Sequence, residues 1–194
     1  MDHWRYYLRA RLLEAFGHRE AAIACYRAAL EAEPGFARAA NRTAYLLASL
    51  DRLEEAEGFF RRTLQAEPGN AVAHFNLGYT LDKRGLHDQA IREFREATRL
   101  GPKIDRAWYG LGLAHAALGQ HREAAAALEE AAKLQPMNPH AWYALGMALH
   151  LTGNAERFHQ VVMHLLRFDP RMTRRLIVES GRTDLAHLVR DLVV

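Results

Sequence analysis

Histidine and cysteine are the side chains of this chain that could bind a metal or act as a nucleophile. The 194 residues include eleven histidines and one cysteine, Cys25. His159 and His164 are five residues apart, which does not place two ligands on one helix face, and His115 and His121 flank a predicted turn. No HExxH, GxSxG, phosphate-binding glycine loop or paired-cysteine motif occurs. We therefore predict that the chain is not an enzyme, and we assign no catalytic residue, metal or cofactor.

Tyrosines and arginines form a second set of side chains, one that could hold a polypeptide. Aromatic rings stack on extended or helical peptides, and guanidinium groups attract acidic ones. The positive charge is almost all arginine, but it is interleaved with Glu and Asp, and the net charge is only +3. A nucleic-acid-binding protein usually carries a denser basic stripe. We predict a protein or peptide partner, and nucleic acid remains an alternative that a salt titration would separate.

The elements that position these side chains follow from the prolines. Five of the six prolines are spaced 34 residues apart, namely Pro34, Pro68, Pro102, Pro136 and Pro170. A fixed period of this size indicates a repeat array. The units, each closed by a proline and free of insertions, are 3–36, 37–70, 71–104, 105–138 and 139–172.

Equivalent positions of the five units carry equivalent residues. Counted from the start of each unit, the eighth position is always Gly or Ala, and the fourth and twenty-fourth are mostly large. These spacings place the fourth and eighth positions on one face of a first helix, and the twentieth and twenty-fourth on one face of a second. Small residues let the two helices approach, and large ones fill the remaining space. Gly17, Gly85, Gly119 and Gly153, with Asp51 in the second unit, predict a tight left-handed turn between the helices.

This pattern resembles the tetratricopeptide repeat over residues 3–172. Phe75-Asn76-Leu77-Gly78-Tyr79 through Pro102, and Trp108-Tyr109-Gly110-Leu111-Gly112 through Pro136, are near-consensus units. The resemblance implies an all-α fold, a right-handed superhelical solenoid of five helix-turn-helix repeats over residues 1–172. It also implies a non-catalytic scaffold that binds proteins or peptides.

The last part of the chain departs from the pattern. Phe158 and Leu165 replace small residues of the fifth unit, which predicts that its two helices splay or rotate. Residues 173–194 are expected to form capping helices over the last apolar face. One helix is predicted near residues 172–179, and a second begins at about Thr183 after a break at Gly181.

The resemblance also implies where a partner would bind. In tetratricopeptide families the second, fifth, sixth, ninth, twelfth and thirteenth positions line a concave groove. The predicted peptide-binding residues are Tyr7, Arg38, Asn41, Arg42, Tyr45, Phe75, Asn76, Tyr79, Arg106, Tyr109 and Tyr143. A fifth-position ring such as Tyr7 or Tyr143 could instead pack against the neighbouring helix. For Tyr45 and Tyr79 we favour binding, because the ninth position is rarely needed for packing.

The charges of this stripe predict a cationic groove. The positive residues are Arg11, Arg38, Arg42, Lys83 and Arg106, against Glu14 and Asp82. A partner segment that suits such a groove is apolar or aromatic with flanking acidic residues.

A chaperone-tail clamp is a more specific function that the sequence disfavours. That clamp needs Lys and Asn at the fifth and ninth positions of one repeat, Asn at the sixth of the next, and Lys then Arg at the second and sixth of the third. Only Asn76 and Arg106 fit this order, whereas Asn41, Tyr45 and Gly110 do not.

Localisation and assembly are weaker expectations. The start of the chain has no apolar core of a signal peptide, and no stretch approaches the ~18 apolar residues of a membrane span. We predict a cytoplasmic protein without membrane insertion. No repeat in this sequence precedes Trp4 and Tyr6 to cover them, and the C-terminal cap carries several apolar residues, so we expect weak self-association through one terminus. An accessory module that presents substrates to an enzyme encoded elsewhere is the alternative to an independent scaffold.

Overall fold

The described part of the chain is entirely helical. A computed structural model describes residues 2–190, and within them eleven α-helices and one 3₁₀ helix follow one another without a strand. The chain divides into two compact units, residues 1–101 and 102–194. The all-α prediction is confirmed.

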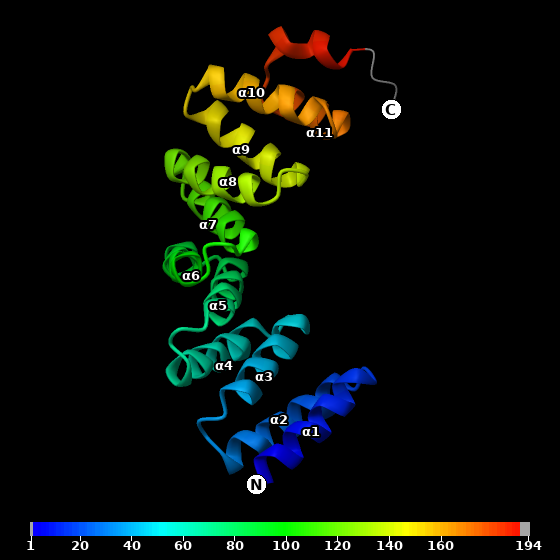
Figure 1. Cartoon of the computed structure of the whole chain (residues 1–194), viewed down its shortest axis with the longest axis vertical. Helices are drawn as coiled ribbons and strands as arrows, with labels where there is room; N and C mark the ends of the chain where they lie inside the picture. Colours follow the sequence, from blue (N-terminus) through cyan, green and yellow to red (C-terminus); the bar gives the residue numbers. More distant parts are fainter. Residues whose placement is uncertain (1, 191–194) are drawn as a thin grey trace. The chain divides into compact units, whose positions relative to one another are not determined.

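The first unit contains three helix pairs (Figure 1). Its helices are α1 (Asp2–Ala15), α2 (Arg19–Ala32), α3 (Ala37–Ser49), α4 (Leu53–Ala66), α5 (Ala71–Lys83) and α6 (His87–Leu100). Each helix packs chiefly against its neighbours in sequence, and α3 also contacts α5. This sequential packing places the first helices of successive pairs, α1, α3 and α5, along one side.

The second unit continues with two helix pairs and a terminal segment. Its elements are α7 (Asp105–Ala117), α8 (His121–Leu134), α9 (Pro139–Leu151), α10 (Ala155–Leu166), α11 (Pro170–Glu179) and the 3₁₀ helix η1 (Thr183–Val189). Gly181 has a φ of +67° and separates α11 from η1, at the predicted break. The second terminal helix is thus a 3₁₀ helix rather than the α-helix suggested by its apolar spacing. Leu185 and Val189 are nevertheless buried. Leu192, which the apolar spacing would place on the same face, lies outside the described residues.

The turns within the helix pairs use a left-handed residue, as the glycine spacing predicts. Gly17, Gly85, Gly119 and Gly153 have φ values between +71° and +79°. Asp51 takes the same place in the second repeat with a φ of +60°, although its Cβ makes that conformation less favourable.

Close approach of two helices explains the small residues at the eighth position. A Cβ built on Gly78 would lie 2.8 Å from the Phe94 ring, and one on Gly112 would lie 2.5 Å from Leu128 Cγ. Both distances are shorter than a real Cβ contact, so the helices could not cross this closely with a side chain there. Phe94 and Leu128 occupy the twenty-fourth position, as the repeat pattern predicts.

The fifth helix pair is built differently. A Cβ on Gly146 would meet Leu176 of α11 at 2.6 Å, instead of a residue of α10. Phe158 and Leu165 are fully buried, and α10 packs less extensively against α9 than the second helices of the earlier pairs do against their first. The two bulky residues therefore coincide with a changed packing in which α11 occupies the close crossing.

In several repeats the backbone carbonyl of the closing proline accepts a hydrogen bond from a side chain. The indole Nε1 of Trp108 donates to the Pro102 oxygen at 2.9 Å, and that of Trp142 donates to the Pro136 oxygen at 2.8 Å. His74 Nε2 lies 3.0 Å from the Pro68 oxygen. These three rings share the fourth position, so that position supplies a hydrogen bond as well as bulk.

In the second repeat a different side chain donates to the proline carbonyl. Its fourth position is Ala40, which cannot donate, and Arg62 Nη2 donates to the Pro34 oxygen at 2.9 Å. The Pro34 carbonyl thus also has a side-chain donor, although the proline itself is exposed.

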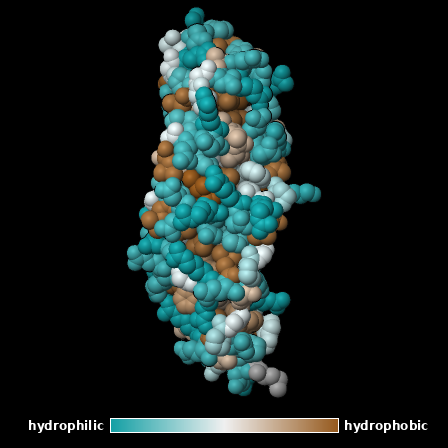
Figure 2. Space-filling model, turned by 90° about the vertical axis from the view of Figure 1, so that its left-hand side faces the viewer, coloured by the Kyte–Doolittle hydropathy of each residue, from teal (hydrophilic) through white to brown (hydrophobic). Residues whose placement is uncertain are grey.

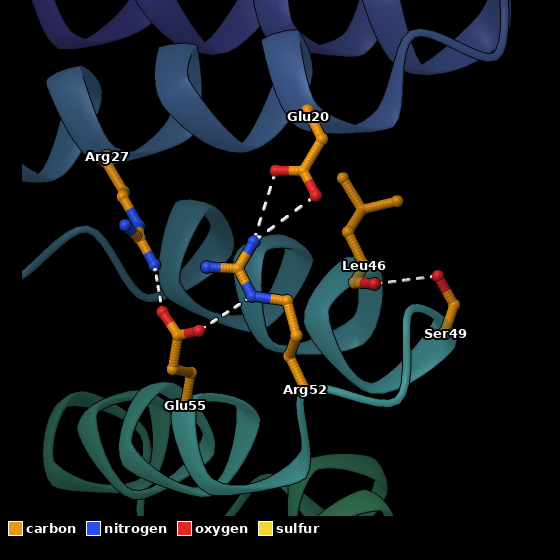
Figure 3. Close-up of polar contacts among 6 residues, drawn as sticks. All are labelled: Glu20, Arg27, Leu46, Ser49, Arg52 and Glu55. Carbon is orange, nitrogen blue, oxygen red and sulfur yellow. Dashed lines mark hydrogen bonds and ion pairs between the residues drawn. The ribbon is translucent and has the colours of Figure 1, made fainter.

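Ion pairs between consecutive repeats recur at one sequence offset. Arg27 contacts Glu55 at 2.6 Å, and Arg157 contacts Glu129 at 2.5 Å. The partners are 28 positions apart in sequence in both cases. Figure 3 shows the first pair extended by Arg52, which lies 2.6 Å from Glu55 and 3.1 Å from Glu20. Exposed pairs of this kind each contribute about 0–1 kcal/mol, so they align repeats more than they stabilise them.

Gly112→Ala is predicted to destabilise the protein by about 1–3 kcal/mol, because its Cβ would displace Leu128 and overpacking costs this amount. Gly58→Ala is the matched control. A Cβ on Gly58 has no atom within 4 Å, so the better helix propensity of alanine should leave stability unchanged or raise it by about 1 kcal/mol. Thermal melts followed by circular dichroism would measure both. Equal melting temperatures for the two variants would refute the close crossing.

Candidate functional site

The inner face of the first unit is the side of α1, α3 and α5 that carries the predicted groove positions. It has two half-exposed tyrosines. Tyr45 on α3 is 53% exposed and Tyr79 on α5 is 48% exposed. Both occupy the ninth position of their repeat, and α3 and α5 contact each other. Two half-exposed rings therefore stand at equivalent positions on helices that contact each other.

A cation accompanies each exposed ring of this face. The Arg38 guanidinium lies 5.7 Å from the Trp4 ring centroid, and the Lys83 ammonium lies 5.7 Å from that of Tyr79. Arg42 lies 5.8 Å from the Tyr45 ring. Cations at such distances are attracted to the ring face. The face can thus offer aromatic contact and positive charge at one place.

Unlike Arg38 and Lys83, Arg42 forms an ion pair within the described residues, with a carboxylate of a neighbouring helix. Its Nη2 donates to Glu14 Oε1 at 2.5 Å and its Nε donates to Glu14 Oε2 at 3.3 Å. The hydroxyl of Tyr26 donates to the same Glu14 Oε2 at 2.7 Å. Sequence reasoning placed Arg42 and Glu14 in the groove as separate charges, whereas the structure joins them in one network between α1, α2 and α3.

This network changes the acidity of its members. Burial raises the pKa of the Tyr26 hydroxyl well above its ordinary value, and the hydrogen bond to Glu14 raises that pKa further. Burial by itself lowers the pKa of Arg42, but hydrogen bonds with Tyr26 and Glu14 outweigh burial and raise it. Arg42 therefore stays charged, and Glu14 neutralises that charge.

The remaining positive charges of the inner face have no such anion. Arg11, Arg38 and Lys83 make no ion pair with a carboxylate in the described chain, and Asp82 lies 2.8 Å from His87. The stripe in the first unit therefore remains cationic after Arg42 and Glu14 cancel.

The predicted fifth-position residues of the first unit are mostly engaged in packing. Tyr7 is only 8% exposed, and its ring lies 5.4 Å from that of Tyr26 and 5.1 Å from that of Phe36. Phe75 is half-buried, with its ring centroid 6.1 Å from that of Phe94. Asn41 is also half-buried, and its amide oxygen is shielded from solvent with no hydrogen-bond partner in residues 2–190. These side chains define the floor of the inner face more than its exposed surface.

The other predicted residues are divided between the units. Asn76 is half-buried on α5 of the first unit, and Arg106, Tyr109 and Tyr143 belong to the second. Tyr109 is half-buried, and that burial raises the pKa of its hydroxyl. Arg106 is exposed on α7.

Tyr143 is engaged by α11, in line with the alternative that a fifth-position ring packs against another helix, although its partners on α11 were not predicted. Its hydroxyl donates to the Glu179 carboxylate, and the Arg175 guanidinium lies 4.9 Å from its ring. Burial is the main cause of the raised pKa of Tyr143, and Glu179 adds to it. Arg175 lies four residues before Glu179, a spacing from which their 2.8 Å ion pair on α11 could be predicted. No such spacing links either residue to Tyr143.

Residues with catalytic or metal-binding potential are scattered. No group of three or more His, Cys, Asp or Glu side chains could hold a metal within residues 2–190. Cys25 is half-buried. On the face shown in Figure 2, apolar residues form patches among hydrophilic ones.

Comparison with known families accounts for this architecture. A sequence model of the tetratricopeptide repeat matches residues 7–71, 75–121 and 113–158. The chain belongs to the tetratricopeptide repeat family. Tetratricopeptide repeat proteins are protein-binding scaffolds and are generally non-catalytic. No curated protein matches the chain in sequence.

Solved structures of the same family have a similar fold. YrrB, described as a TPR protein with an unusual peptide-binding site, is 22% identical with a TM-score of 0.80 over 91% of this chain and 90% of its own. MamA is 18% identical with a TM-score of 0.79, over 95% of this chain and 96% of its own. PilF of Pseudomonas aeruginosa is 21% identical with a TM-score of 0.66, over 98% of this chain and 93% of its own. At these identities the likeness establishes the fold alone.

Unlike a membrane-spanning chain, this tetratricopeptide repeat protein has no helix in residues 2–190 that is both long and apolar enough to cross a bilayer.

The Tyr26 network predicts a loss of stability at alkaline pH. The folded state favours the neutral phenol, so its contribution is fully present below the ordinary pKa near 10 and is lost as the pH rises above it. Denaturant unfolding between pH 8 and pH 11 should show stability falling above about pH 10, and less steeply in Tyr26→Phe. Tyr45→Phe, which removes an exposed hydroxyl, is the control and should retain the slope of the unsubstituted protein. An equal slope in Tyr26→Phe would exclude this role for the network.

Proposed function

We propose that the inner face of α1, α3 and α5 binds a peptide segment of a partner protein. The observation that carries this proposal is the pair of half-exposed rings, Tyr45 and Tyr79, at the same repeat position on contacting helices. An aromatic ring that stays exposed in a folded scaffold provides a large contact area at low entropic cost. The peptide-binding site described for the similarly folded YrrB supports the proposal.

The charge of this face selects the chemistry of the segment. Arg11, Arg38 and Lys83 attract acidic residues, while the rings favour apolar or aromatic ones. The segment that fits both is short, apolar or aromatic at its centre and acidic at its flanks. Exposed charges contribute mainly to the rate and orientation of binding, so the rings should supply most of the affinity.

The proposed contact residues are a subset of those predicted from the sequence. Tyr45, Tyr79 and Arg38 are exposed and stand at its centre, while Asn76 and Phe75 contribute from the floor. Tyr7 is buried and Arg42 is neutralised, so we assign them the shape and stability of the face. Arg106, Tyr109 and Tyr143 would make the equivalent contacts in the second unit, where Arg175 already contacts the Tyr143 ring.

Tyr45→Ala combined with Tyr79→Ala is expected to weaken peptide binding by about 2 kcal/mol or more, roughly 30-fold, because exposed rings of this kind act as binding hot spots. Peptides selected on the unsubstituted protein from a random display library should be enriched in aromatic and acidic residues. Calorimetric titration of one selected peptide would measure the loss. Arg38→Ala with Lys83→Ala should cost less and should flatten the salt dependence of binding.

Tyr6→Ala is the matched control, because Tyr6 is a 42% exposed tyrosine of the same unit that lies outside the stripe. Circular dichroism should show that all variants remain folded. Selected peptides that bind the tyrosine double variant as tightly as the unsubstituted protein would show that the inner face is not the site.

A further inference from the structure

The outward face of α1 carries an exposed apolar ridge. Leu8, Leu12 and Phe16 follow one another at four-residue intervals and are 63%, 61% and 72% exposed. Tyr7 and Ala10, on the opposite side of the helix, are buried. A helix that is apolar on both sides normally has both sides covered. Within the described residues, only the side facing α2 and α3 is covered.

Later repeats show what covers the position equivalent to Leu12. Leu46, Thr80 and Ala148 occupy the same repeat position as Leu12, and none is more than 3% exposed. In each case the helix that bears the residue packs against the second helix of the preceding pair: α3 against α2, α5 against α4, and α9 against α8. The geometry of the fold therefore suits this face to an α-helix lying along it.

The charges beside the ridge restrict the identity of that helix. Arg9 and Arg11 flank the ridge and have no acidic partner in residues 2–190, while Arg5 reaches only Asp2, at 3.9 Å. A second copy of the same face would bring these arginines together, and like charges oppose association. A helix with acidic residues along its edges would be attracted instead.

We propose that the outward face of α1 is a docking site for one amphipathic α-helix of a partner protein. Its apolar stripe packs on Leu8, Leu12 and Phe16, and its acidic edges face Arg5, Arg9 and Arg11. The arrangement repeats the packing of α2 on α3, with the partner helix in the place of the preceding one. The ridge shares Leu8 and Arg11 of α1 with the inner face, whereas Tyr45 and Tyr79 of the peptide-binding proposal lie on α3 and α5, so substitution of those two tyrosines separates the two proposals.

Two synthetic helical peptides with the same leucine stripe, one edged with Glu and the other with Lys, test the proposal. In fluorescence anisotropy at low salt, the acidic peptide should bind at least about tenfold tighter than the basic one. Leu8→Ser with Leu12→Ser should weaken binding of the acidic peptide at least about tenfold. Arg9→Ala with Arg11→Ala should weaken it about threefold and reduce its salt dependence.

Leu151→Ser is the control, since Leu151 is a 56% exposed leucine on α9. It should bind the acidic peptide like the unsubstituted protein. Because all the substituted side chains are exposed, thermal melts should be unchanged in every variant. The inner-face variant Tyr45→Ala with Tyr79→Ala should also bind the acidic peptide normally, which keeps failure here distinct from failure of the peptide-binding proposal.

Three results would overturn the assignment. Equal binding of the acidic and basic peptides, or unchanged binding in Leu8→Ser with Leu12→Ser, would remove the helix-docking role. Sedimentation with phosphatidylglycerol vesicles but no peptide binding, lost in the same double variant, would assign the ridge to an anionic membrane. A concentration-dependent dimer lost in that variant would assign it to a second copy of the chain.

Discussion

The small size of the eighth-position residue, which is Gly or Ala in every repeat, is the constraint on which the structure depends. At Gly78 the Phe94 ring comes to 2.8 Å from where a Cβ would stand, and at Gly112 the side chain of Leu128 comes closer still. This contact fixes the separation and rotation of the two helices in a pair. Once the first helix is fixed, its fifth position is directed toward the packed interior and its ninth toward the inner face. The ninth position lies about 100° around the helix from the eighth, so Tyr45 and Tyr79 point away from the close crossing and stay half-exposed, whereas Tyr7 at the fifth position is buried.

Much of the fold could be predicted because backbone rules act locally. Proline stops a helix and glycine permits a left-handed turn, so their spacing predicted the helix pairs before any tertiary contact was known. The crossing of α11 over Gly146 could not be found in this way. Leu176 stands outside the five-unit pattern, and its choice in place of a residue of α10 depends on how the bulky Phe158 and Leu165 are accommodated. The 3₁₀ conformation of η1 was equally inaccessible, because apolar spacing alone does not separate two helix types over so short a segment.

The candidate site was less predictable than the fold, for a reason that Arg42 illustrates. A repeat position states which way a side chain leaves the helix, but a long side chain can reach several acceptors from there. The offset of 28 residues between Arg42 and Glu14 is shared by Arg27 and Glu55, so the sequence did contain a signal for the pair. It did not show that Glu14 would also accept from Tyr26 and thereby hold the guanidinium away from a ligand. The side chain of Tyr79 has few rotatable bonds, so its position was easier to predict.

The acceptor at each closing proline has a consequence for how such a chain can change in evolution. In three repeats a ring at the fourth position of the following unit donates to that carbonyl, but Ala40 cannot, and Arg62 of the same unit donates instead. The alanine and the arginine that compensates for it therefore belong to the same unit. Replacing Arg62 alone by the equivalent residue of another unit would remove the donor to the Pro34 carbonyl, whereas transposing the whole unit would carry the donor with it. The repeats have a uniform length, but the smallest segment that can be exchanged without losing this hydrogen bond is the complete unit.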